Sequence, residues 1–127
     1  MKSLQKKTIL SLLVLSLSVL LCACGVVSSG SYSSVGSVDN MSDRKINHVY
    51  SSFNGDRTYT ADIKAGSTLK MEITTKSGSL AVTVTQDSGE LFRTEEAGSF
   101  SVPIEKDGKV SIALKAVSHE GSYLFTW

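Results

Sequence analysis

From about residue 48 onward, apolar and polar residues alternate along the chain. Tyr59, Ala61 and Ile63 are apolar, for example, whereas Thr60 and Asp62 between them are polar. The same period of two recurs in 69–73, 80–84, 100–104, 110–114 and 123–127. This pattern is typical of antiparallel strands that bury one face, and no segment after residue 24 has a helical period. We therefore expect an all-β domain of about eight short strands.

Glycines separate these segments at Gly55, Gly66, Gly78, Gly89, Gly98, Gly108 and Gly121. Because glycine adopts positive φ without steric cost, we expect tight turns at these points. Many short strands with regular turns are typical of a sandwich or a barrel. A barrel of about 80 residues would need tight shear, so we expect a small antiparallel, jelly-roll-like β-sandwich.

Two positions predict the order of strands in the sheet. Pro103 lies inside an alternating segment and cannot donate to a ladder, which predicts an edge strand or a bulge. The last segment places Tyr123, Phe125 and Trp127 on one face. Since these side chains would be a large share of a small core, we expect the last strand to be central or well covered.

The chain opens with a different pattern. Three lysines precede an apolar run from Ile9 to Leu21 that only serines interrupt. This run of 13 residues is shorter than the roughly 20 that a membrane-spanning helix needs. It has the length of the apolar region of a secretory signal, with the lysines on the cytoplasmic side.

The apolar run ends in Leu21-Cys22-Ala23-Cys24, which resembles the lipobox of bacterial lipoproteins. Ala23 is the small residue before the cysteine, whereas modification of Cys22 would put bulky Leu21 at the cleavage position. The resemblance implies that residues 1–23 are a lipoprotein signal peptide and that Cys24 carries a diacylglycerol and further fatty acyl chains such as palmitate. Two or three acyl chains anchor stably, since each buried CH₂ contributes about 0.8 kcal/mol.

The lipobox also predicts the location. We expect the protein on the extracytoplasmic face of the cell membrane, held by its lipid; in a cell with two membranes this includes the outer membrane. Residues 24–46 are rich in Ser and Gly and show no period, so we expect a flexible tether ahead of a domain at 47–127. For residues 39–46, the alternative is a short turn or an edge strand.

The size and charge of the chain exclude several classes of protein and of partner. A chain of 127 residues allows one small domain. The formal net charge of +1 becomes slightly negative once the signal and its three lysines are removed. We therefore expect no nucleic-acid partner and no polybasic membrane patch. The two cysteines lie within three residues of each other, so no disulfide framework is expected.

Candidate catalytic chemistry is sparse. His48 and His119 each lie beside a turn or a strand start, which favours solvated surface histidines over a base or a ligand. The acidic residues lack an EF-hand pattern, and turn capping accounts for Asp87 and Asp107. No nucleophile-elbow motif precedes a helix. We therefore expect no enzymatic activity, no metal and no cofactor.

Aromatic residues are the candidate binding residues. Tyr50, Phe53 and Phe92 are candidates for exposed positions, where they would stack on sugar rings or anchor a protein. The alternative is that they cover the edge of the sandwich. The first interpretation predicts a lipid-anchored accessory module that contacts cell-surface glycan or protein. The second hypothesis is a structural envelope component that self-associates or supports a surface assembly.

The turn-rich part of the chain carries a resemblance. Its residues are Phe53-Asn54-Gly55, 64–69, Ser77-Gly78-Ser79-Leu80, Asp87-Ser88-Gly89, 104–110 and 121–127. In these segments the domain resembles the bacterial pre-peptidase C-terminal type of β-sandwich and short bacterial surface lipoproteins. The resemblance implies an accessory, non-catalytic module, and it transfers no individual site residue.

Overall fold

The computed structural model describes residues 25–127. The predicted signal peptide, residues 1–23, and the predicted lipidation site, Cys24, lie outside the described residues. The described chain forms eight strands and no helix, which confirms the expected all-β antiparallel fold. The strands are β1 (Val26–Ser29), β2 (Tyr32–Val35), β3 (Val38–Ser42), β4 (Lys45–Ile63), β5 (Thr68–Gln86), β6 (Gly89–Thr94), β7 (Gly98–Pro103) and β8 (Gly108–Thr126).

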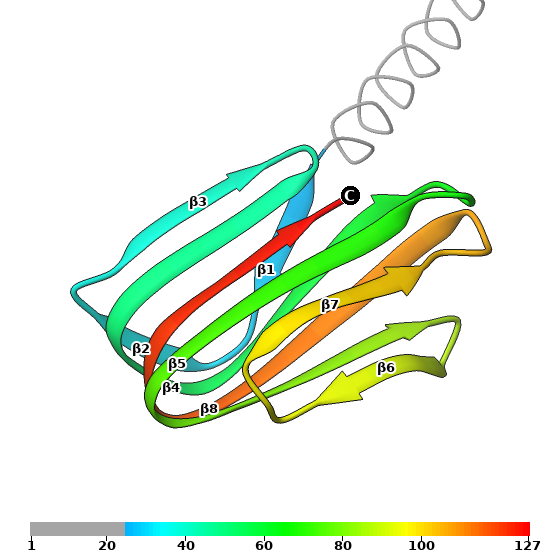
Figure 1. Ribbon diagram of the computed structural model, residues 1–127. Coiled ribbons are helices and arrows are strands. Elements are labelled where there is room, and N and C mark those ends of the chain that lie inside the picture. Colours follow the sequence, from blue (N-terminus) through cyan, green and yellow to red (C-terminus); the bar gives the residue numbers. More distant parts are fainter. Residues whose placement is uncertain (1–24) are drawn as a thin grey trace, which may run out of the picture.

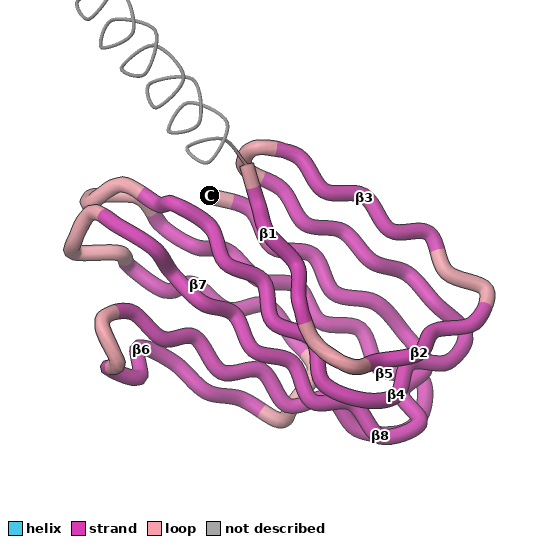
Figure 2. The backbone as a smooth tube through the Cα atoms, turned by 180° about the vertical axis from the view of Figure 1, so that it is seen from behind, coloured by secondary structure: helices cyan, strands magenta, loops and turns pink. Residues whose placement is uncertain are grey.

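The sandwich is a single sheet folded over on itself. β4, β5 and β8 are each 19 residues long and bend near their middle (Figure 1). The start of β4 pairs with the end of β8 (Lys45 with Thr126), and the end of β4 pairs with the start of β8 (Ile63 with Gly108). β3 and β7 flank one layer, β1 and β6 flank the other, and β2 runs along the bend (Figure 2).

The length of these strands differs from the expectation of short ones. Gly66, Gly89, Gly98 and Gly108 lie at or beside connections between strands, but the other three predicted turns, at Gly55, Gly78 and Gly121, are bends inside long strands. At these bends the backbones approach closely. A Cβ on Gly78 would overlap the carbonyl of Ser118, and one on Gly121 would overlap the carbonyl of Thr74. Glycine is therefore required there by contact between the bent strands, not by a hairpin.

The placement of the last strand and of Pro103 is confirmed. β8 lies between β4 and β5, and its Tyr123 and Phe125 are fully buried in the core. Pro103 ends β7, which pairs with β5 and with no other described strand, so β7 forms an edge of the sheet. The missing amide donor of this proline therefore interrupts no central ladder.

The expected flexible tether is wrong for the described residues. β1, β2 and β3 lie within 26–42 and pair antiparallel with β4, so the domain begins at Val26 instead of residue 47. The alternative of an edge strand near residues 39–46 is closer to the structure, because β3 spans Val38–Ser42. All five residues of β3 are exposed, which explains why the sequence shows no alternation there.

Candidate functional site

The three aromatic residues expected at the surface lie elsewhere. Tyr50 and Phe53 are buried in the core, and Phe92 is half-buried against Phe100, with ring centroids 5.2 Å apart. The prediction of an exposed aromatic patch is therefore wrong. Both Tyr50 and Phe53 are buried because β4 bends between them, where its register with β8 shifts. Residues three apart on a regular strand face opposite sides, but here both side chains point inward.

The prediction of two surface histidines is also wrong. His48 and His119 are 1% and 0% exposed and lie on the inner faces of β4 and β8 near the bend. The Nδ1 atom of His119 lies 2.6 Å from the Tyr50 hydroxyl, and its Nε2 atom lies 2.8 Å from Thr75 Oγ1. Burial lowers the pKa of both histidines below 6.5, so both are neutral at pH 7.

A second chain of hydrogen bonds runs through His48. Its Nδ1 atom lies 2.8 Å from the Tyr123 hydroxyl and 3.5 Å from Arg57 Nη1. Arginine can only donate, so Nδ1 is the acceptor and Tyr123 donates to it. The Tyr59 hydroxyl, 2.6 Å away, then donates to the oxygen of Tyr123. Burial raises the pKa of both tyrosines, which keeps them protonated at neutral pH.

Arg57 joins this network to the strands that precede β4. Its Nη2 atom lies 2.7 Å from Asp39 Oδ2 on β3, and its Nε donates to Ser28 Oγ on β1 at 2.7 Å. The guanidinium carbon also lies 4.6 Å from the ring centroids of Tyr32 on β2 and Tyr59 on β4. One side chain of β4 therefore contacts all three strands of the N-terminal segment.

These contacts assign a structural role to the network. Within residues 25–127, every fully buried side-chain nitrogen or oxygen has a hydrogen-bond partner. In the same range, no three His, Cys, Asp or Glu side chains come close enough to share a metal ion. The histidines are enclosed by aromatic rings, with Phe53 and Tyr123 edge-on to His48. The network fixes the bend and the N-terminal strands.

The surface of residues 25–127 includes three shallow hollows that could take a ligand. The first, about 310 Å³, lies where β5 and β6 meet the connection after β7; Leu91, Val102 and Glu105 are among its lining residues. The second, about 300 Å³, lies on the outer face near the bend, lined in part by Val49 and Thr74. The third, about 130 Å³, lies at the end where the described chain begins; it is lined by Asp43, Arg44, Asp62, Lys64, Ser67 and Trp127.

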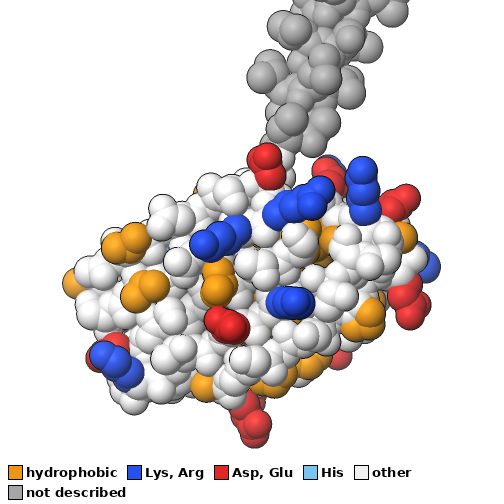
Figure 3. Space-filling view, turned by 45° about the horizontal axis from the view of Figure 1, so that its top comes forward, with side chains coloured by type: hydrophobic (Ala, Val, Ile, Leu, Met, Phe, Trp, Pro, Cys, Tyr) orange, Lys and Arg blue, Asp and Glu red, His pale blue; other side chains and the backbone are white. Residues whose placement is uncertain are grey.

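The third hollow has more charged side chains than the second, whose lining includes Lys76 and Glu120. It combines two cationic and two anionic side chains with a half-buried tryptophan. Figure 3 shows lysine, arginine and acidic side chains interspersed around this end of the molecule. A site of this kind suits a small ligand that carries both signs of charge.

No protein-family model matches the sequence, and a search of curated proteins returns no match. Among residues 25–127, the part with described structure, there is no helix of sufficient length and apolarity to cross a bilayer.

Proposed function

We propose that this chain is a bacterial lipoprotein, anchored through Cys24 on the extracytoplasmic face of the cell membrane, whose sandwich is a non-catalytic binding module. The observation that carries the proposal is the sequence Leu21-Cys22-Ala23-Cys24 behind a short apolar run. The start of the sheet supports it, because β1 begins at Val26, two residues after the cysteine. A folded domain that starts just past a cleavage site is consistent with removal of everything before Cys24.

The exposed side chains favour a protein partner over a glycan. Stacking on sugar rings needs a free aromatic face, and Tyr50 and Phe53 are in the core. Tyr32 is 38% exposed, but its ring packs against Arg57 and Phe53. On the outer face near the bend, Val38 and Val49 are instead directly paired across β3 and β4, and they are 60% and 47% exposed. Val49 also lines the hollow of about 300 Å³. An aliphatic surface beside a hollow is typical of contacts between proteins.

Site-specific photo-crosslinking in the cell of origin tests the proposal. A photoreactive residue at position 49 should give a discrete crosslinked protein, because this position lies on the proposed contact surface. The matched control is position 27, a valine that is 64% exposed on the outer face of the other layer. Crosslinks of equal yield at both positions, or none at position 49, would contradict a binding surface near Val49.

A second candidate function is self-association as an envelope component. The observation that favours it is the outer edge of β3, which pairs with β4 on one side and with no other described strand. Such an edge is a template for pairing with another chain. The same experiment separates the two functions, since a crosslinked product of twice the mass of the chain indicates a second copy.

A further inference from the structure

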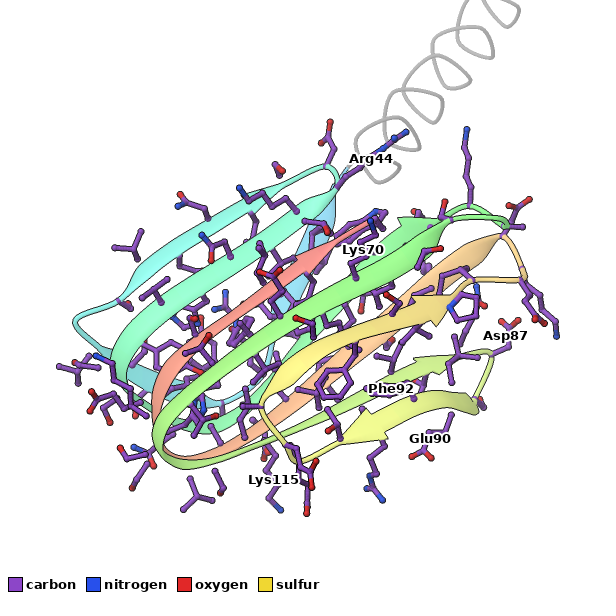
Figure 4. The ribbon with its side chains drawn as sticks, in the orientation of Figure 1. Arg44, Lys70, Asp87, Glu90, Phe92 and Lys115 are labelled. Atoms are coloured by element: carbon purple, nitrogen blue, oxygen red, sulfur yellow. The ribbon has the colours of Figure 1, made fainter. Side chains whose placement is uncertain are left out.

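Several parts of the chain meet at the end of the sandwich where the described residues begin. Val26 pairs with Ala61, close to the end of β4. The connections β3–β4, β4–β5 and β7–β8 lie at this same end, together with Trp127 (Figures 1 and 4). Hydrogen bonds hold them together, from Trp127 N to Arg44 O (3.2 Å), from Gly66 N to Ile104 O (2.8 Å) and from Ala65 N to Asp107 Oδ1 (2.7 Å).

This end must lie close to the lipid if Cys24 is acylated. Gly25 follows Cys24 directly in the sequence, and one trans peptide unit spans about 3.8 Å from Cα to Cα. Gly25 is followed at once by β1, which is hydrogen-bonded into the sheet. The flexible tether expected at residues 24–46 therefore does not separate the sandwich from the acyl chains. Its turn-bearing end faces the headgroups, and the bend is at the far end.

The third hollow opens at this end. Its charged side chains, Asp43, Arg44, Asp62 and Lys64, are all exposed, and Arg44 projects beside the start of the described chain (Figure 4). Its volume is about 130 Å³, against about 30 Å³ for each water in the liquid. The hollow therefore has room for a group the size of a phosphate, with a neighbouring ammonium at its open rim.

We propose that the hollow binds the headgroup of a zwitterionic phospholipid, with Arg44 and Lys64 on the phosphate and Asp43 and Asp62 on the ammonium. The inference rests on the proposed acylation of Cys24. The mixture of charges selects this headgroup, because a purely anionic lipid would face the two carboxylates as well. Trp127 completes the surface, since tryptophan is enriched at the membrane–water interface.

Trp127 also supplies the probe, because it is the only tryptophan in the chain. The protein isolated from its own cell is reconstituted into vesicles of phosphatidylethanolamine and phosphatidylglycerol, with and without bromine on the acyl chains next to the headgroup. We expect bromine to quench the Trp127 emission at least twofold. The doubly substituted variant Arg44→Glu, Lys64→Glu should lose most of this quenching. The control variant Lys115→Glu should keep it, because Lys115 is exposed near the bend at the opposite end (Figure 4).

Flotation of the vesicles separates the two proposals. Protein that does not float, with an unmodified Cys24, overturns the proposed anchoring. Protein that floats without quenching of Trp127 overturns the headgroup contact and leaves the anchoring intact. The assignment of the hollow is overturned if quenching survives charge reversal at Arg44 and Lys64. It is also overturned if quenching needs phosphatidylglycerol and is absent in vesicles of zwitterionic lipid alone. Circular dichroism of each variant confirms that the sheet is retained.

Discussion

Removal of the Arg57 guanidinium should destabilise the whole domain and release its N-terminal strands. Arg57 is 2% exposed, and its charge is matched by Asp39, whose side chain is 30% exposed. Breaking a buried pair costs about 3–5 kcal/mol, and the lower end applies because Asp39 can rehydrate. The lost contacts with the rings of Tyr32 and Tyr59 add about 0.5–1 kcal/mol each. We expect Arg57→Met to cost about 3–4 kcal/mol, since methionine keeps much of the apolar stem.

Thermal unfolding followed by circular dichroism measures this change. In a domain of about 100 residues, each kcal/mol lowers Tm by roughly 4–8 °C, so we expect a decrease of at least about 12 °C. Limited proteolysis should cut the variant within residues 26–42, where β1 to β3 have lost their common contact. The matched control is Arg93→Ala, because Arg93 is exposed and its nearest carboxylate, Glu90, lies 3.8 Å away. This control should change stability by less than about 0.5 kcal/mol.

A double-mutant cycle isolates the ion pair from the other contacts of Arg57. The variants Arg57→Met and Asp39→Asn, alone and together, should give a coupling free energy of about 1–2 kcal/mol. A Tm decrease of less than about 3 °C for Arg57→Met, with an unchanged proteolysis pattern, would refute the role of Arg57 in holding the N-terminal strands.

Two further predictions concern the bend. Gly121→Ala should lower the free energy of unfolding by more than about 2 kcal/mol, because the new Cβ meets the backbone of Thr74. The control Gly89→Ala should be nearly neutral. Equal urea midpoints for the two variants would contradict close contact at the bend. The free energy of unfolding should be constant above about pH 6.5 and fall as the pH decreases below it. The reason is that burial lowers the pKa of His48 and His119, so the unfolded chain binds protons at a higher pH than the folded one. Urea midpoints at pH 5.5 and 7.5 measure this, and equal values would contradict it.

The inward positions of the network could be predicted from the sequence in part. His48 and Tyr50 lie two and four residues after Ile46, so all three face the same side of a regular strand. Arg57 lies two residues before Tyr59, so these two also share a face. A polar residue at an inward position indicates a buried hydrogen-bond partner. The sequence could not identify that partner. Tyr123 lies 75 residues from His48, and Asp39 belongs to a segment that shows no alternation.

The alternation of apolar and polar residues does not predict the bend. Glycine at positions 55, 78 and 121 suits a hairpin turn as well as a bend, and only the pairing with neighbouring strands distinguishes the two. The N-terminal strands also lack a clear sequence signal. They are edge strands with mostly exposed residues, and main-chain bonds to β4 and one arginine hold them, so their sequence resembles a linker.

We propose that Cys24 becomes the acylated first residue of the mature protein. Mass spectrometry of the amino-terminal peptide, from protein isolated from its own cell, tests it most directly. We expect a peptide that starts at Cys24 and carries the mass of a diacylglycerol, with or without an additional acyl chain on the amine. A peptide that still contains Met1, or a free thiol at Cys24, would contradict it.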